Sequence, residues 1–313
     1  MPFTFSNRNF CFHLKREYNE RKDVIRKQKE KEMEEEKVKK SLIAGSVGLG
    51  TIAAVAGTAA IYSSFIEPYW FDIKKVTIKL PRLPEAFKGV HIVQISDFHL
   101  GFHFRTRHIN KMAEKIQKLQ PDLVIFTGDL VNSKRSRWSA VKSIPGLKSI
   151  EAPLGKFAVL GNHDYLEDID TISELLRKSG FELLVNENRK LTKGNDNFYI
   201  AGLDDYLQGE ADIEKSLEGI PEDQFTLFLA HEPDYFKVSS KFPIDLQLSG
   251  HSHGGQVRMP LYGPIITSRM GRKFHTGHYE SEEKHLYTNR GMGTTHLPFR
   301  FFCRPEITSI VLE

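Results

Sequence analysis

The sequence is poor in cysteine, with only Cys11 and Cys303 among its 313 residues. These two residues lie on opposite sides of a charge-free segment that is long enough to cross a membrane, so they are not expected to pair. A disulfide framework is therefore excluded, and both thiols are expected to be buried or incidental. The fold must be held by a hydrophobic core, and 40% apolar residues suffice to form one.

The larger part of the chain also lacks an excess of charge. The net charge is +4, and the first forty residues alone carry twelve Lys or Arg against eight Asp or Glu. The remainder is neutral and has no basic stripe with interleaved aromatic residues, which disfavours nucleic-acid binding. We therefore expect no nucleic-acid partner.

Residues 41–66 contain no charged side chain in an unbroken run of 26 residues. At about 1.5 Å per residue, a helix of this length crosses a hydrocarbon layer of roughly 30 Å. The run is rich in Gly, Ala, Ser and Thr, which makes it only modestly hydrophobic but allows close packing in lipid. Because a Lys/Glu-rich arm precedes it, a transmembrane helix is favoured over a buried core helix.

The sequence contains one signal for cleavage of this segment and one against it. Small residues at 54–56 and 58–60 would permit cleavage, but a forty-residue arm is too long for an ordinary signal peptide. We expect a retained signal anchor; Met33 is an alternative start that would leave a short basic arm. Residues 21–40 carry nine Lys or Arg and residues 67–79 carry three, so the positive-inside rule predicts a cytoplasmic N-terminus.

The chain is thus expected to consist of four parts. They are a charged arm, partly disordered or helical (1–40), the anchor (41–66), a tether with a first strand (67–87) and a catalytic domain (88–313). Within the domain, apolar runs alternate with helical stripes at residues 109–119, 169–176 and, more weakly, 211–217. Later strands at 198–201, 285–288 and 308–312 have no helices between them, which indicates a second, mixed sheet.

Five polar blocks each follow an apolar run that predicts a buried strand. They are Asp97-Phe98-His99, Gly128-Asp129, Gly161-Asn162-His163-Asp164, Ala230-His231-Glu232 and Gly250-His251-Ser252-His253. Asp, His and Asn supply the oxygen and nitrogen donors that divalent metals prefer. Because strand ends meet at one rim of a sheet, the blocks predict one dinuclear metal site. A single such histidine would be interpreted as a core residue, but several in this pattern favour metal binding.

At these residues the chain resembles the calcineurin-like metallophosphoesterases, whose pattern is D-x-H, GD, GNH[DE], H and GHxH. The resemblance extends over residues 88–312. Four further segments are similar to a bacterial membrane-tethered branch of YkuE-like and UDP-2,3-diacylglucosamine-hydrolase-like proteins: 229–234, 254–256, 291–294 and 303–306. The resemblance implies an α/β fold, a four-layer α/β/β/α sandwich of two mixed sheets. Here a charged helix and one transmembrane helix would precede it.

The resemblance also implies the ligands of two divalent metal ions, which could be Mn, Fe or Zn. The first ion would be held by Asp97, His99, Asp129 and His253. The second would be held by Asp129, Asn162, His231 and His251, so that Asp129 bridges the two.

Beside the ligands, His163 would contact phosphate and protonate the leaving oxygen, and Asp164 would hold the tautomer of His163. The alternative for Asp164 is a cap of the following turn.

The expected function is hydrolysis of a phosphate mono-, di- or pyrophosphoester by water activated between the two metals, at the cell membrane and outside the cytoplasm. A nucleotide-sugar lipid or another lipid-linked envelope metabolite would suit a tethered enzyme. Asn132 stands where protein phosphatases of this fold carry a second acidic residue, and no Arg follows, which disfavours that activity. The alternatives are a scaffold with little catalysis, disfavoured by the complete ligand set, and a nuclease of the same fold.

Three segments are expected to determine substrate choice: 132–150, 186–197 and 254–280. In the last of these, Gly255 is expected to let the backbone approach phosphate, and Gln256 to orient a metal ligand through its amide. The alternative is that the glycines only shape a turn.

Overall fold

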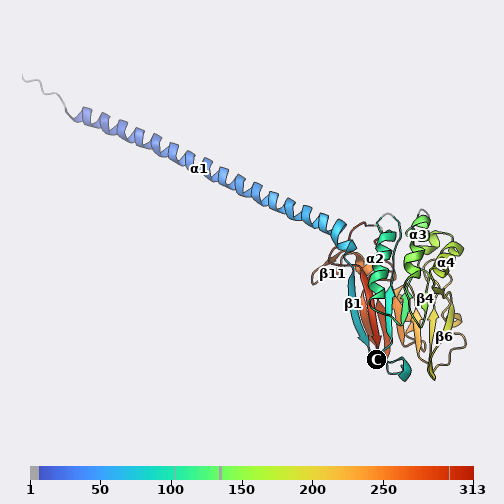
Figure 1. Ribbon diagram of the computed structural model, residues 1–313. Helices are drawn as coiled ribbons and strands as arrows, with labels where there is room; N and C mark the ends of the chain where they lie inside the picture. The colour runs from blue at the N-terminus through green and yellow to red at the C-terminus, as the bar shows by residue number, and fades with distance from the viewer. Residues whose placement is uncertain (1–6, 102, 134–135, 296) are drawn as a thin grey trace, which may run out of the picture. The chain divides into compact units, whose positions relative to one another are not determined.

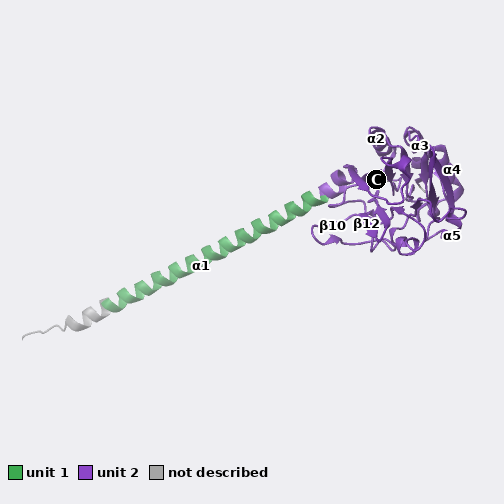
Figure 2. Cartoon of the chain, turned by 90° about the horizontal axis from the view of Figure 1, so that it is seen from below, with its two compact units in different colours: residues 1–60 green, residues 61–313 purple. Residues whose placement is uncertain are grey.

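The computed structural model describes residues 7–101, 103–133, 136–295 and 297–313. The chain divides into two compact units, residues 1–60 and residues 61–313 (Figures 1 and 2). This boundary lies inside the charge-free run. The last residues of the run, 61–66, therefore belong to the second unit.

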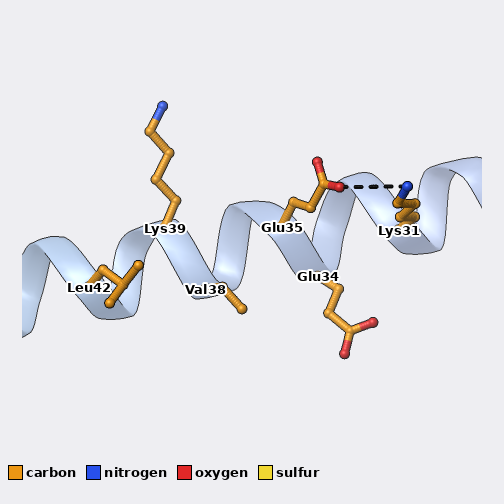
Figure 3. Close-up of a pocket in the computed structure, with 6 residues that line it drawn as sticks. All are labelled: Lys31, Glu34, Glu35, Val38, Lys39 and Leu42. Carbon is orange, nitrogen blue, oxygen red and sulfur yellow. Dashed lines mark ion pairs between the residues drawn. The ribbon is translucent and has the colours of Figure 1, made fainter.

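The described part of the first unit is helix α1 (Asn7–Ile61), whose last residue, Ile61, is the first residue of the second unit. The Lys/Glu-rich part of α1 carries i,i+4 ion pairs, such as Lys40 Nζ to Glu36 Oε1 at 2.8 Å and Lys31 Nζ to Glu35 Oε1 at 4.0 Å (Figure 3). The side chains of residues 15–58 are all exposed, as expected for a helix without a packing partner in the described part of the chain. By length and composition, this helix is apolar enough to cross a membrane.

The second unit opens with two short helical turns, Tyr62–Ile66 and Glu67–Tyr69, and then forms a first six-stranded sheet. Its strand order is β1-β14-β2-β3-β4-β5, and only the β14–β2 pair is antiparallel. The strands are β1 (Asp72–Ile78), β2 (His91–Ile95), β3 (Leu123–Phe126), β4 (Lys156–Ala158), β5 (Glu182–Leu183) and β14 (Glu306–Leu312). The first strand of the predicted tether is therefore an edge strand of this sheet.

A second six-stranded sheet follows the order β12-β13-β9-β8-β7-β6, with parallel pairs in the centre and an antiparallel pair at each edge. The strands are β6 (Glu187–Lys193), β7 (Asp196–Gly202), β8 (Thr226–Leu229), β9 (Leu246–Ser249), β12 (Gly277–Ser281) and β13 (Lys284–Thr288). A separate hairpin is formed by β10 (Arg258–Met259) and β11 (Gly263–Pro264).

Alternation of side chains along the strands builds three apolar layers between four layers of secondary structure. In β2, Val93 and Ile95 pack towards α2 (Thr106–Gln117), whereas Ile92 packs between the two sheets. In β8, Leu227 and Leu229 face the first sheet, and Phe228 lies in the outer layer. The outer helices are α3 (Arg137–Lys148) and α4 (Ile169–Lys178) beside α2, with α5 (Ile213–Ser216) and α6 (Phe236–Ser239) on the second sheet. The predicted two-sheet α/β fold is confirmed.

Most of the segment 132–150, one of the three expected to determine substrate choice, forms the helix α3. Pro145 and Gly146 disfavour a helix locally, but Ala140 and Leu147 are buried in the core next to α2 and α4. Packing therefore outweighs the local signal. Lys134 and Arg135 of this segment lie outside the described residues.

Candidate metal centre

The predicted ligands all lie at the carboxyl ends of parallel strands. In the first sheet, Asp97 and His99 follow β2, Asp129 follows β3 and Asn162 follows β4. In the second sheet, His231 follows β8, while His251 and His253 follow β9. Because the two sheets pack face to face, both contribute donors to one place.

Five of these seven residues adopt a left-handed backbone conformation, with φ between +45° and +64°. They are Asp97, His99, Asp129, His251 and His253. Non-glycine residues seldom adopt this conformation, and those that do gather at functional sites. Hydrogen bonds between the loops maintain it: Asp97 N donates to Gly128 O at 2.9 Å, and His99 N donates to Asp129 O at 3.1 Å. Nothing in the sequence signals this feature.

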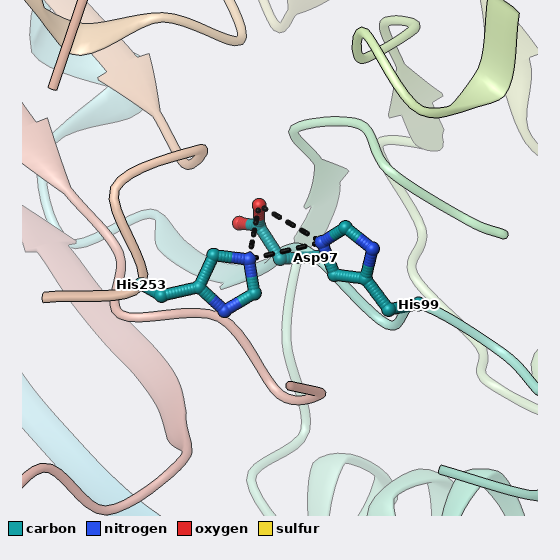
Figure 4. Close-up of side chains that lie close together, drawn as sticks. All are labelled: Asp97, His99 and His253. Atoms are coloured by element: carbon teal, nitrogen blue, oxygen red, sulfur yellow. Dashed lines mark hydrogen bonds and ion pairs between the residues drawn. The ribbon is translucent and has the colours of Figure 1, made fainter. Parts of the chain in front are cut away.

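Asp97, His99 and His253 form the first donor group (Figure 4). His253 Nε2 lies 2.9 Å from His99 Nε2 and 3.3 Å from Asp97 Oδ1. Two ring nitrogens each about 2.1 Å from one ion are about 3 Å apart when they subtend a right angle. The observed separation therefore fits two adjacent ligands of a single cation.

A second donor group forms around Asp129. Its Oδ2 atom lies 3.2 Å from His99 Nε2 and 3.3 Å from His231 Nε2, so one carboxylate stands between the two groups. His231 Nδ1 faces the carbonyl of Thr127 at 2.6 Å, which fixes the proton on Nδ1 and leaves Nε2 as a lone-pair donor. The buried Nε2 has no hydrogen-bond partner, as expected of a metal ligand.

His251 and Asn162 complete this group. The ring Nε2 of His251 faces the carbonyl of Arg269 at 2.6 Å, so the proton lies there and the Nδ1 lone pair points into the site. This Nδ1 atom is 3.0 Å from Asn162 Oδ1. Two acceptors facing each other at this distance fit a shared cation. The donor set and its tautomers therefore suit a pair of divalent ions.

The electrostatic environment of the site keeps the Asp97 carboxylate charged and the His251 and His253 rings neutral. Burial raises the pKa of Asp97, but the neighbouring His253 outweighs it and lowers the pKa to about 2. Burial lowers the pKa of both His251 and His253 to about 4, so that both rings are neutral and can act as ligands. For His231, burial acts in the same direction, but the Asp129 carboxylate raises the pKa well above its usual value. Asp129 thus attracts positive charge to the centre of the site.

The structure does not show the predicted pairing of Asp164 with the His163 ring. Both carboxylate oxygens of Asp164 instead accept backbone N–H groups: Oδ2 from Asp129 and Gly161, each at 3.0 Å, and Oδ1 from Leu130 at 2.8 Å and Val131 at 3.3 Å. His163 Nδ1 faces the carbonyl of Asn132 at 3.4 Å. Asp164 therefore fixes the loop that carries Asp129, and it is a positioning residue because unpaired amides there would be buried.

Replacing Asp164 by asparagine is expected to lower the free energy of unfolding by about 1–3 kcal/mol. The side-chain NH₂ group would face two of the four N–H donors and leave them unsatisfied. Denaturant unfolding of the purified protein measures this, with the exposed Asp223→Asn as the matched control. An unchanged midpoint in Asp164→Asn would contradict the positioning role.

Two buried residues near the site were not predicted from the sequence. Arg300 is fully buried and donates to the carbonyls of Gly293 and Cys303, with NH2 3.4 Å from His253 Nδ1. No motif marks it. Asp205 is also buried, and burial, together with the charge of Asp205, raises the pKa of Glu232, the neighbour of His231. Asp205 lies just after β7, as each of the five blocks lies just after a strand. This position in the sequence could have indicated a site residue.

A cavity opens onto the donor groups. Its lining includes the predicted site residues Asp129, Asn162, His163, His251 and His253, together with Leu207, Ile266, Arg269 and Leu297. Gly255 and Gln256 also line it, and the amide of Gln256 does not orient a metal ligand as predicted. A Cβ atom on Gly255 would collide with Pro264 of the hairpin, and the Gln256 amide bonds to Thr295 N (2.7 Å) and Leu297 O (3.2 Å) rather than to a predicted ligand.

Comparison with known proteins agrees with this geometry. The family model for calcineurin-like phosphoesterases matches residues 90–255. The chain is 36% identical to the uncharacterized metallophosphoesterase YkuE of Bacillus subtilis, with 86% of this chain and 94% of that protein covered. It is 32% identical to a transmembrane protein with metallophosphoesterase domain of Danio rerio (84% and 61%). It is 28% identical to the UDP-2,3-diacylglucosamine pyrophosphatase LpxG of Chlamydia muridarum (85% and 96%).

Proposed function

Because the chain belongs to the calcineurin-like phosphoesterase family, we propose that it is a membrane-anchored hydrolase of phosphate mono-, di- or pyrophosphoesters that uses two divalent metal ions. The position of Asp129 supports this most directly. Its Oδ2 atom lies 3.2 Å and 3.3 Å from the Nε2 atoms of His99 and His231. A carboxylate between two histidine groups is suited to bridge two cations.

In this proposal Asp97, His99 and His253 would hold one ion, Asn162, His231 and His251 would hold the other, and Asp129 would contribute to both. When bound, the pair lowers the pKa of a water molecule between them and offsets the charge that develops on phosphate. Asn162 contributes a neutral oxygen, which keeps the charge of the ligand set low. The site therefore stays electropositive and attracts an anionic substrate.

His163 is the proposed proton donor to the leaving oxygen. Its ring stands perpendicular to that of His99, with 4.6 Å between the ring centres, and it lines the cavity. With the Nδ1 proton directed at the Asn132 carbonyl, a protonated ring would donate from Nε2. Burial lowers the pKa of His163, and the charge of Asp129 opposes this shift without offsetting it.

A lipid-linked substrate fits both the cavity and the N-terminal helix. Leu207, Ile266 and Leu297 contribute apolar side chains to the lining of the cavity, beside the predicted ligands. The relative LpxG is a pyrophosphatase of UDP-2,3-diacylglucosamine, a nucleotide sugar with two acyl groups. An anchor at residues 41–66, with the N-terminus in the cytoplasm and the catalytic domain outside it, would hold the site near such substrates.

The proposal is tested with the full-length protein in detergent and added Mn²⁺. We expect hydrolysis of a phosphate mono-, di- or pyrophosphoester, loss of activity with EDTA and recovery when Mn²⁺ is restored. Metal analysis should find about two ions per chain. Activity that persists in EDTA contradicts the metal mechanism. Less than one ion per chain without turnover would favour a scaffold, and a preference for nucleic acid would favour a nuclease.

A further inference from the structure

The hairpin β10–β11 carries large apolar side chains that pack against nothing in the described structure. Leu261 at its tip is fully exposed and Tyr262 is 89% exposed, and Ile265 follows at 58%. Leu261 also has a φ of +71°, a conformation that glycine or asparagine adopts more readily. A turn in water does not require leucine and tyrosine at such positions, and an exposed apolar group marks an interaction site.

Hydrogen bonds tie this hairpin to the residues that end the charge-free run. Arg258 N donates to Phe301 O, and Phe301 N donates to Gln256 O, both at 2.9 Å. In the same loop, Arg300 N donates to Ser63 O at 2.9 Å, and Phe302 N donates to the buried carboxylate of Glu67 at 3.0 Å. The hairpin, residues 300–303 and residues 63–67 are therefore neighbours within one compact unit.

Each of these three segments exposes apolar side chains. Phe302 is 58% exposed and lines the same surface groove as Leu261 and Tyr262, while Phe65 and Ile66 are 73% and 48% exposed. We call these residues, with Ile265, the apolar rim: Phe65, Ile66, Leu261, Tyr262, Ile265 and Phe302. Because Phe65 and Ile66 belong to the charge-free run itself, the rim is continuous with the segment expected to lie in lipid.

The charged side chains exposed in the two loops of the apolar rim are basic, and the one acidic neighbour in the third segment, Glu67, is buried. Residues 254–279 contain four Lys or Arg and no Asp or Glu, and residues 291–305 contain Arg304 and the fully buried Arg300 without an acidic residue. The guanidinium of Arg304 lies over the half-exposed ring of Trp70, 3.6 Å from its centre. Aromatic rings and basic side chains next to apolar ones suit the headgroup region of a bilayer, where anionic lipids meet the basic residues.

We propose that the apolar rim is a second membrane contact, in which Leu261 and Tyr262 insert into the surface of a bilayer that contains anionic lipids. The partner is lipid rather than protein, because the rim continues the charge-free run and the exposed charged side chains of residues 254–279 and 291–305 are basic. Gly255 and Ile266, which lie just before and just after the hairpin in the sequence, line the cavity of the candidate metal centre. On the proposed function, this contact would open that cavity to the lipid surface and deliver amphiphilic phosphoesters to it.

The test uses full-length protein in liposomes of phosphatidylcholine and phosphatidylglycerol. A fluorescent label sits on Leu261→Cys in a Cys11→Ser background; Cys303 is buried and does not react. Lipids with a quencher on the acyl chain report insertion. Asn195→Cys, in the exposed turn between β6 and β7, is the water-exposed control, and Leu49→Cys in the charge-free run is the anchor control. We expect strong quenching at residues 261 and 49, none at 195, and weaker quenching at 261 without phosphatidylglycerol.

Each outcome bears on a different claim. Quenching at 49 but not at 261 overturns the membrane contact and leaves the anchor intact. Quenching at 261 but not at 49 supports the contact and contradicts the anchor. Energy transfer between labels at 261, without lipid quenching, would instead identify a second copy of the chain as the partner and overturn the proposal.

A functional measurement separates this contact from the proposed activity. The double variant Leu261→Glu with Tyr262→Glu is expected to slow hydrolysis of a phosphoester embedded in liposomes at least fivefold, while the rate on a soluble aryl phosphate stays the same. Equal loss on both substrates contradicts a docking role. If the unmodified protein hydrolyses neither substrate, the proposed function fails, and the labelling experiment still decides the membrane contact.

Discussion

Replacing Asp129 by asparagine is expected to reduce metal-dependent hydrolysis by more than about 10³-fold, to the level of the EDTA-treated protein. Loss of a single stabilising donor at a reacting centre already costs about 10²–10³-fold, and Asp129 serves both donor groups. Asparagine keeps the size of the side chain but removes the charge that lies 3.2 Å and 3.3 Å from two histidine nitrogens. The bridging ligand and its attraction for cations are both lost.

The measurement compares turnover with bound metal per chain. We expect the metal content of Asp129→Asn to fall from about two ions to one or fewer. The exposed Asp223→Asn should retain the turnover and the metal content of the unmodified protein. Full turnover in Asp129→Asn would show that Asp129 does not bridge. A normal metal content in Asp129→Asn, with no activity in any of the proteins compared, would show the same.

Gly161→Ala is expected to have nearly as large an effect without altering any ligand. A Cβ atom at residue 161 would lie 2.6 Å from the backbone nitrogen of Asp129 and 2.7 Å from Cε1 of His231, and would collide with the Asp129 carboxylate. Backbone atoms cannot move away as a flexible side chain can. The two loops must separate, so we expect about a 10²-fold loss of turnover, as observed when a group near a reaction is displaced by about 1 Å.

The readouts for this variant are metal content, turnover and the thermal midpoint. Gly219→Ala is the control, because its Cβ would meet no atom within 4 Å although its φ is +78°. It adds backbone strain without a collision, so a drop in Tm with normal activity is expected there. Gly161→Ala with unchanged metal affinity would indicate that the loops adapt and that the close approach is not required.

The sequence was sufficient to predict the fold class and the residues that meet at the site. Each predicted ligand stands directly behind a buried strand, and parallel strands end at the same rim, so the juxtaposition of Asp97 with Asp129 follows from local patterns. The contact partners of Asp164 could not be predicted in the same way. Its four amide bonds depend on how the loops after β3 and β4 fold over each other, which no local pattern encodes.

Two other segments show where local signals are insufficient. Helix α3 contains Pro145 and Gly146, both unfavourable in a helix interior, yet the burial of Leu147 holds it against the core. For Gly255, flexibility next to the site suggested contact with phosphate. The structure shows that the absent Cβ leaves room for Pro264, a contact with a residue nine positions later in the chain. Tertiary packing decides both cases.

The left-handed backbone at five predicted ligands bears on how such a site can be lost in evolution. Each of these conformations costs roughly 1 kcal/mol or more for a residue with a side chain. Glycine would remove that cost, so a lineage no longer selected for metal chemistry would gain stability from glycine at Asp97, His99 or His251. This chain retains Asp or His at all five positions. On the proposed function, the lower stability of these loops is the consequence of keeping metal-binding side chains at those positions.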